Sequence, residues 1–366
     1  MIPFLDMKPA YAELKAGLDA AYTRVMESGW FVLGKEVEAF ESEYAAFCGT
    51  KHCIGLGNGL EALELVLRGW NIGAGDEVIV PSNTYIATWL AVTAVGARVV
   101  PVEPTLAGPN IDPDRIAAAL SSRTRAIMPV HLYGEPADMD AIMTLAGKHG
   151  LRVIEDVAQA QGSKVRGRRA GALGHAGAHS FFPTKNIGAF GDGGAVTTDD
   201  PQLADRLRAL RNYGSKVKYV NIERGYNSRL DELQAALLRV KLPKLDEWNE
   251  RRRVLAARYD DRLAGIPGLG LPRVPQWAEP AWHLYVVRTT RRAELVKALD
   301  AAGIGSLIHY PIPPHLQQAY ADLNLPKGTF PLAEQLAETV LSLPMGPHMK
   351  AEQVDEVAAT VRRALT

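Results

Sequence analysis

The stretch that decides the fold is Ser180-Phe181-Phe182-Pro183-Thr184-Lys185-Asn186-Ile187-Gly188-Ala189-Phe190-Gly191-Asp192-Gly193-Gly194. Its single lysine follows an aromatic pair and a proline and precedes four glycines. Such an apolar setting lowers the pKa of a lysine by desolvation, so that the neutral amine can attack a carbonyl. The glycines let the backbone turn tightly beside a planar ligand. A buried-stem lysine in a glycine-rich hairpin is the alternative interpretation of this stretch.

The composition is that of an ordinary globular protein, with 366 residues, 47% hydrophobic and 22% charged, and no formal net charge. The length favours one large domain and a smaller one. Zero net charge gives no general attraction to nucleic acid or to an anionic membrane. No stretch approaches the ~18 apolar residues of a membrane span, and the start has no secretory signal pattern. Cys48 and Cys53 lack a metal or redox spacing, so we expect a reduced cytoplasm.

Short apolar runs alternate with helical segments between Cys53 and Asp156. This alternation predicts a mainly parallel sheet that is covered by helices on both faces. In such sheets ligands bind at the carboxyl ends of the strands, where Tyr85, His131 and Asp156 fall. Asp156 is interpreted either as a helix N-cap or as a carboxylate that pairs with a cationic ring nitrogen.

The turn Gly57-Asn58-Gly59-Leu60 leads from an apolar run into a helix, with Asn58 as the expected N-cap. Free amides at a helix start suit a phosphate, although a plain strand–turn–helix explains the pattern equally well. Leu60 stands where a dinucleotide fingerprint needs its third glycine, which disfavours a nicotinamide site. The pair His175 and His179 lacks a third ligand, so we expect no metal site.

The chain divides near residue 245, which gives a large domain at 1–245 and a small one at 246–366. A highly charged helix over 244–264 leads away from the large unit, and a proline-rich segment follows it. The polar, lysine-bearing loop over 213–227 is too long for a mere connector and is a functional candidate.

Four features follow one another along the chain: the glycine turn, an aromatic at a strand end, an Asp-x-x-Gln and a serine five residues before a lone lysine. Together they match what an aldehyde cofactor with a pyridine ring and a phosphate requires. The sequence resembles the fold-type I, pyridoxal-phosphate-dependent sugar aminotransferases of the DegT/StrS type over nearly its whole length. The stretches that carry the resemblance are Gly57-Asn58-Gly59-Leu60-Glu61-Ala62-Leu63, Pro81-Ser82-Asn83-Thr84-Tyr85, Glu155-Asp156-Val157-Ala158-Gln159-Ala160, Ser180–Gly194 and Gly225-Tyr226-Asn227-Ser228-Arg229-Leu230-Asp231.

The resemblance implies an α/β, aspartate aminotransferase-like fold with a mainly parallel sheet in the large domain and a smaller C-terminal α+β domain. It implies that Lys185 forms the Schiff base with pyridoxal phosphate and later shuttles the substrate proton, while Asp156 keeps the pyridine nitrogen protonated. The other implied cofactor contacts are Gln159 at the ring hydroxyl, Tyr85 stacked on the ring, Asn58, Gly59, Leu60 and Ser180 at the phosphate, and Asn227 from the second subunit of a homodimer with shared sites.

Two further stretches, Pro129-Val130-His131-Leu132-Tyr133-Gly134 and 309–317, are most similar to the branch that aminates C3 of dTDP-linked 3-keto-6-deoxyhexoses with L-glutamate, which leaves as 2-oxoglutarate. The residues implied at the sugar nucleotide are Lys216, Lys218, Tyr219, Arg229, His309, Tyr310 and His315. The alternatives are a 4-aminating enzyme, a UDP-linked amino-hexuronate aminotransferase, and a regulatory protein that binds the cofactor without turnover.

Three departures from the family pattern are visible. Leu60 replaces a frequent threonine, Leu106-Ala107-Gly108-Pro109 replaces a more polar and aromatic stretch, and Phe182-Pro183-Thr184 replaces a Tyr-Pro-Gly typical of 3-aminating members. The last departure is shared with 4-aminating relatives. Related dehydratases carry histidine in place of the lysine, so Lys185 favours aminotransfer.

Overall fold

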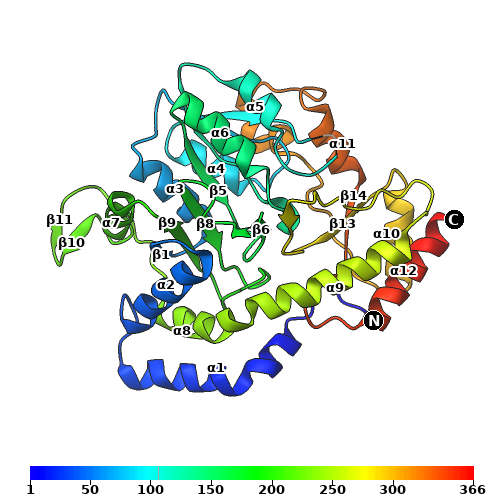
Figure 1. Cartoon of the computed structure of the whole chain (residues 1–366), viewed down its shortest axis with the longest axis horizontal. Helices are drawn as coiled ribbons and strands as arrows, with labels where there is room; N and C mark the ends of the chain where they lie inside the picture. The colour runs from blue at the N-terminus through cyan, green and yellow to red at the C-terminus, as the bar shows by residue number, and fades with distance from the viewer. Residues whose placement is uncertain (106) are drawn as a thin grey trace.

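A seven-stranded sheet forms the centre of the larger part of the chain (Figure 1). The computed structural model describes residues 1–105 and 107–366, so the Leu106 departure lies outside the described residues. The strand order is β1-β9-β8-β5-β4-β2-β3. The strands are β1 (His52–Leu56), β2 (Glu77–Pro81), β3 (Arg98–Val102), β4 (Thr124–Ile127), β5 (Arg152–Asp156), β8 (Ala176–Ser180) and β9 (Gly194–Thr198).

Strand pairing confirms the predicted, mainly parallel sheet. β3, β2, β4, β5 and β8 run parallel, and only the pairings of β9 with β8 and with β1 are antiparallel. Successive side chains of a strand point to opposite faces, and β2 illustrates this because Val78 and Val80 join one hydrophobic cluster while Ile79 joins another. Both faces are therefore buried, as expected for a parallel sheet.

Helices cover the two faces. The cluster on one face is built from α3 (Gly59–Gly69), α4 (Ala87–Ala94) and α7 (Pro201–Leu210), and the cluster on the other from α5 (Pro113–Ala119) and α6 (Met139–His149). Asp200 begins α7 by accepting from the amides of Gln202 and Leu203, and Asp138 begins α6 by accepting from Ala141.

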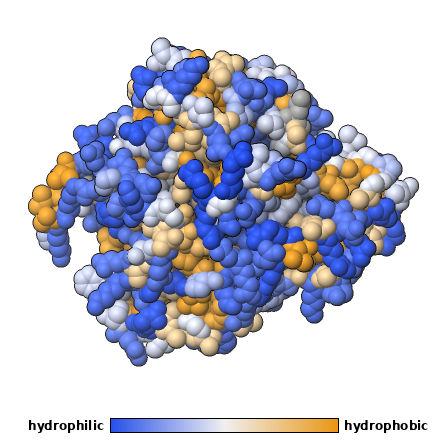
Figure 2. All heavy atoms as spheres, in the orientation of Figure 1, coloured by the Kyte–Doolittle hydropathy of each residue, from blue (hydrophilic) through white to orange (hydrophobic). Residues whose placement is uncertain are grey.

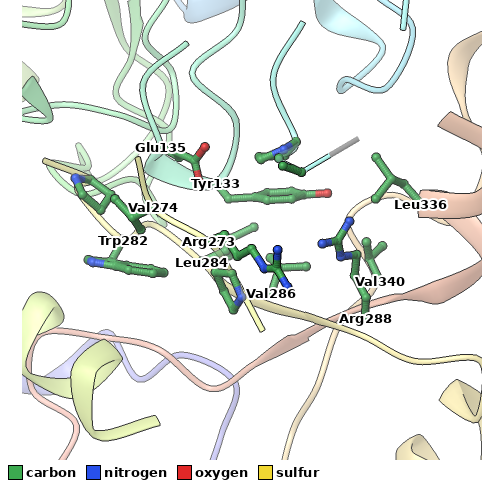
Figure 3. A pocket seen from close by; sticks show the side chains of 15 residues that line it. Tyr133, Glu135, Arg273, Val274, Trp282, Leu284, Val286, Arg288, Leu336 and Val340 are labelled. Carbon is green, nitrogen blue, oxygen red and sulfur yellow. The ribbon is translucent and has the colours of Figure 1, made fainter. Parts of the chain in front are cut away.

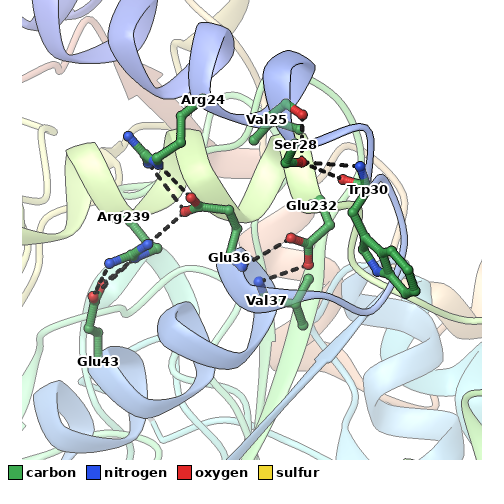
Figure 4. A network of polar contacts seen from close by, with 9 residues as sticks. All are labelled: Arg24, Val25, Ser28, Trp30, Glu36, Val37, Glu43, Glu232 and Arg239. Carbon is green, nitrogen blue, oxygen red and sulfur yellow. Dashed lines mark hydrogen bonds and ion pairs between the residues drawn. The ribbon is translucent and has the colours of Figure 1, made fainter.

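Three helices at one edge of the sheet are joined by charged side chains (Figure 4). They are α1 (Lys8–Ser28), α2 (Lys35–Cys48) and α8 (Glu232–Lys241). Glu36 of α2 accepts from Arg24 of α1 and from Arg239 of α8, each at 2.6 Å. Glu232 of α8 accepts from the backbone N–H groups at the start of α2, which has no capping side chain of its own.

The part of the chain that follows α9 (Leu245–Leu263) contains a small two-stranded sheet. In it β13 (Tyr285–Arg288) pairs antiparallel with β14 (Val340–Leu343). Its cluster includes side chains from α9, α10 (Arg292–Ala301) and α12 (Ala351–Leu365). α11 (Pro331–Thr339) leads into β14. Ile2 packs into the same cluster and pairs with Ile304, so the first residues lie beside the C-terminal part. The division at residue 245 stays a prediction.

The surface includes two exposed apolar segments. The hairpin of β10 (Ser215–Val217) and β11 (Val220–Asn221) projects from the large part, and hydrophobic atoms gather there in Figure 2. The loop between α1 and α2 exposes Trp30 by 62% and Phe31 by 51%. Among the described residues, none of the helices combines the length and the apolar character that crossing a bilayer needs.

Candidate active site

A cleft with an empty volume of about 1400 Å³ opens at the carboxyl ends of β2, β5 and β8. This is the edge at which open α/β sheets bind ligands. The predicted residues that line the cleft are Asn58, Gly59, Leu60, Tyr85, Asp156, Gln159, Ser180, Lys185, His309 and Tyr310. Segments that are far apart in the sequence, from Asn58 to Tyr310, thus meet at one place.

Lys185 lies in the loop that follows β8. Two hydrogen bonds hold the backbone of this loop. The Lys185 N–H donates to the Phe182 carbonyl at 2.9 Å, and the buried Lys241 ammonium donates to the Gly188 carbonyl at 2.5 Å. Burial of the Lys185 amine lowers its pKa to about 8, although the Asp156 charge opposes this. No hydrogen bond or ion pair within residues 1–105 and 107–366 involves this amine, so it is available to react.

Asp156 ends β5 and is 7% exposed. One oxygen accepts from the Ala158 N–H at 3.1 Å, and the other accepts from the Thr88 hydroxyl at 3.2 Å. Burial raises the pKa of this carboxyl, while these hydrogen bonds and the nearby Lys185 lower it. A buried carboxylate is costly without a cationic partner, so the site suits a protonated ring nitrogen.

The start of α3 forms an anion site against the end of β8. The Asn58 side chain caps α3 by accepting from the Glu61 N–H at 2.9 Å, which confirms the predicted N-cap. The first-turn amides of Gly59 and Leu60 have no acceptor within the helix. A Cβ on Gly59 would lie 2.6 Å from the Ser180 Cβ, so only glycine lets the helix start approach this serine.

Gln159 connects the cleft to two tyrosines. Its Oε1 accepts from the Tyr133 N–H at 2.7 Å and its Nε2 donates to the Tyr310 hydroxyl at 2.9 Å. The rings of Tyr310 and Tyr85 have centroids 5.3 Å apart, and Tyr85 is 55% exposed to the cleft. His309 bonds Ser342 through Nδ1 at 2.8 Å, and burial lowers its pKa to about 4.

The other predicted residues lie outside the cleft of this protomer. Lys216 pairs with Asp205, and Lys218 lies 5.2 Å from the centroid of the Tyr219 ring on the projecting hairpin. Asn227 is exposed and forms a backbone β-bridge with Asn212, and Arg229 donates to the Asn212 side chain at 3.1 Å. His315 is buried and bonded to Glu334 at 3.0 Å. Their functional roles stay predictions.

The sequence analysis did not identify one residue that lines the cleft, His283, and one residue behind it, Thr88. His283 comes from the segment before β13 and bonds Asn186 through Nδ1 at 3.1 Å, and burial holds its pKa well below the ordinary value. Thr88, behind the cleft, is four residues after Thr84 and contacts Asp156. The i, i+4 spacing was the available signal for Thr88, whereas nothing local marked His283.

The histidine pair that was judged an improbable metal site is accounted for by hydrogen bonds. His179 bonds Tyr44 at 3.0 Å and Thr197 at 2.9 Å, and His175 accepts from the Val153 N–H at 2.9 Å. His131 bonds Glu155 at 3.0 Å and does not line the cleft. Within the part of the chain that the structure describes, no cluster of three or more histidine, cysteine or acidic residues could hold a metal ion.

Comparison with known proteins agrees with this geometry. Residues 13–362 match the DegT/DnrJ/EryC1/StrS aminotransferase family. The chain belongs to this family. A dTDP-3-amino-3,4,6-trideoxy-α-D-glucose transaminase of Streptomyces venezuelae is 57% identical over 361 residues, which cover 99% of this chain and 95% of the relative.

Solved structures show the same fold. The crystal structure of S. venezuelae DesV in complex with a ketimine intermediate superposes with a TM-score of 0.98 at 57% identity, covering 99% of this chain and 98% of the other. NtdA of Bacillus subtilis with bound PMP has a TM-score of 0.93 at 30% identity, covering 100% of this chain and 85% of the other. The chain is thus an aminotransferase with pyridoxal phosphate as its cofactor, and both predictions are confirmed.

Proposed function

We propose that this enzyme transfers an amino group from L-glutamate to C3 of a dTDP-linked 3-keto-6-deoxyhexose. The chemistry is supported by the cleft in which the Lys185 amine and the buried Asp156 carboxylate meet. The choice of C3 and of the dTDP group is supported by the 57% identity with a transaminase whose name specifies both.

Each residue of the cleft has a definite task in this reaction. When bound, pyridoxal phosphate supplies an electron-withdrawing ring that stabilises negative charge on the substrate carbon. Asp156 keeps a proton on the ring nitrogen, and the hydrogen bonds from Ala158 and Thr88 orient its two oxygens. The amides of Gly59 and Leu60, with Ser180, hold the phosphate.

Lys185 acts as the acid and base of the transfer. Its pKa of about 8 leaves a useful fraction of neutral amine near neutral pH, and the protonated remainder can return a proton. In our proposal its Nζ holds the cofactor between turnovers and moves a proton at the carbon that loses or gains the amine. Tyr85 and Tyr310, whose ring centroids lie 5.3 Å apart at the cleft, limit where that carbon lies.

The working unit is proposed to be a homodimer in which Asn227 and the β10–β11 hairpin serve the cleft of the other subunit. Asn227 and the tip of the hairpin are exposed and lie outside their own cleft, and the exposed Trp30–Val32 loop offers apolar surface for the contact.

A cytoplasmic location is also proposed, which agrees with the two free, buried cysteines, Cys48 and Cys53.

The function is tested with the purified holoenzyme, L-glutamate and a panel of dTDP-linked 3-keto and 4-keto 6-deoxysugars. We expect 2-oxoglutarate and a sugar that carries its new amine at C3, identified by NMR. Amination of the 4-keto sugars alone would overturn the position. Loss of cofactor colour with glutamate but no amination of any sugar would overturn the substrate class.

A further inference from the structure

A second cavity lies between the large and small parts of the chain, apart from the cofactor cleft (Figure 3). It has an empty volume of about 540 Å³ and shares none of its lining residues with the cofactor cleft. Its walls are mostly apolar and come from both parts: the large part contributes Pro109 and Tyr133, and the small part contributes Trp282, Leu284, Val286, Leu336 and Val340. Apolar pockets at the junction of two parts of a chain are frequent places for small-molecule sites.

One acidic side chain enters this apolar space. The backbone of Glu135 is fixed, because its N–H donates to the Leu132 carbonyl at 3.0 Å and its carbonyl accepts from Asn110 at 3.0 Å. Its carboxyl packs beneath Gly108, where a Cβ would lie 3.3 Å from Oε1. Among the hydrogen bonds and ion pairs of the described residues, none reaches this carboxyl. The Glu135 carboxyl is half-buried beside apolar walls, and a carboxylate in such a setting suits a cationic ligand.

The chemistry around Glu135 selects the ligand. The aromatic side chains of Trp282 and Tyr133 line the same cavity, and aromatic faces together with a carboxylate recognise organic cations. Two charged side chains, Arg288 and Arg273, line the same cavity as Glu135. In Figure 3 the Tyr133 ring lies between Glu135 and Arg288. A ligand therefore fits with its cationic end at Glu135 and its apolar body along the valine and leucine wall.

We propose that this second cavity binds an apolar organic ammonium, with its charge on Glu135 and its body against Trp282 and Tyr133. The site is separate from the proposed transamination and does not depend on the sugar that the enzyme uses.

Tyr133 connects this cavity to the cofactor cleft. Its N–H donates to Gln159 Oε1 at 2.7 Å and its hydroxyl donates to the His309 carbonyl at 2.5 Å, and both Gln159 and His309 line the cleft. A ligand that packs on the Tyr133 ring therefore contacts a residue that bonds two cleft residues, His309 through its hydroxyl and Gln159 through its backbone N–H. Because coupling between sites is reciprocal, occupancy of either one changes affinity at the other.

The test is calorimetric titration of the holoenzyme with benzyltrimethylammonium. A quaternary ammonium is needed because a primary amine would react with the cofactor aldehyde. We expect binding that weakens about tenfold or more in Glu135→Gln, which keeps the shape but removes the charge. Glu338→Gln is the matched control, because Glu338 is an exposed acid on α11, near the cavity but outside its lining, and should leave the affinity unchanged.

Two further readouts make the test specific. Burial raises the pKa of Glu135 to about 8, so affinity for this non-titrating cation should rise roughly tenfold from pH 7 to pH 9, and this rise should vanish in Glu135→Gln. The anion 3-phenylpropionate should bind more weakly than the cation. Absent binding, binding unaffected by Glu135→Gln, or preference for the anion at Arg288 would each overturn the site.

The connection through Tyr133 has its own measurement. Saturating benzyltrimethylammonium should shift the absorbance band of the bound cofactor, and Tyr133→Leu, which removes the ring and its hydroxyl, should abolish that shift. An unchanged band in the wild-type protein, with binding confirmed by calorimetry, would overturn the coupling between the two cavities.

Discussion

Thr88 and Asp156 are joined by a buried hydrogen bond in which Thr88 Oγ1 donates to Asp156 Oδ2 at 3.2 Å. The hydroxyl of Thr84 lies 2.9 Å from that of Thr88. Because a hydroxyl has a single proton to donate, Thr88 must accept from Thr84 while it donates to Asp156. Two threonines four residues apart thus fix the direction of the Asp156 carboxylate in the cleft.

Thr88→Val should lower kcat about tenfold, because a hydrogen bond to a charged group contributes about 1.5–3 kcal/mol. This bond favours the ionised Asp156 and lowers its pKa, so its loss raises the pKa and moves the acid limb of the rate profile to higher pH. Thr88→Ser, which keeps the hydroxyl, should behave as the wild type. Equal acid limbs in the valine and serine variants would contradict this role.

Lys185→Ala should abolish turnover and leave the cofactor bound only through non-covalent contacts. The amine is the group in the cleft that is both desolvated and unpaired among the described residues, so no neighbouring side chain can replace it. Borohydride treatment followed by mass spectrometry measures the covalent link. A reduced protein–cofactor adduct in the alanine variant would show that another residue carries the bond.

A second buried lysine predicts a pH-dependent stability. Burial lowers the pKa of Lys241 to about 8, whereas an unfolded lysine titrates near 10.5. Between these values the unfolded chain binds the extra proton, so stability rises with pH. The free energy of unfolding of the wild type relative to Lys241→Met should therefore increase by up to about 3 kcal/mol from pH 8 to pH 10.5. Denaturant titration of both proteins across this range measures it, and a constant difference would contradict the buried charge.

The parallel sheet and the cofactor residues were predictable because their signals are local. Strand β3 contains one of the apolar runs from which the sheet is predicted, and Asn58 caps α3 as its place after a glycine predicts. Strand β8 (Ala-Gly-Ala-His-Ser) was missed because it has no β-branched residue, and its place in the sheet comes from pairing with β5 and β9.

Contacts between distant segments were not predictable from spacing. The segment 306–308 forms only a single bridge, Leu307 with Ser342, whereas β14 is a strand through its pairing with β13. Glu135 carries no motif, and its apolar surroundings arise only when the segment around Trp282 packs beside it. Such environments depend on tertiary packing, which single-sequence patterns do not contain.

Shared sites predict complementation between inactive subunits. Lys185→Ala and Asn227→Ala proteins should each be inactive or nearly so, because each lacks one group that every cleft needs. After subunit exchange, a hybrid dimer has one cleft with both groups intact. We expect a mixture to recover a fraction of the wild-type rate. Exchange is verified with differently tagged chains, and a mixture that exchanges but stays inactive would contradict sharing.

The lysines of the projecting hairpin predict a selective effect on the sugar nucleotide. Lys216 lies in β10 and Lys218 lies in the turn that follows it, two residues further along the hairpin, so both ammonium groups can reach one pyrophosphate. Lys216 pairs with Asp205, at an exposed position where such a pair contributes little and is easily exchanged.

Lys216→Ala with Lys218→Ala should raise the KM for the sugar nucleotide about tenfold or more and leave the half-reaction with glutamate unchanged, because glutamate has no pyrophosphate. Asp205→Asn is the control, since it frees Lys216 without removing its charge and should leave KM the same or lower. Stopped-flow loss of the cofactor absorbance reports the glutamate half-reaction, and steady-state rates report KM. If both half-reactions slow together, the hairpin supports the fold of the site and does not bind the pyrophosphate.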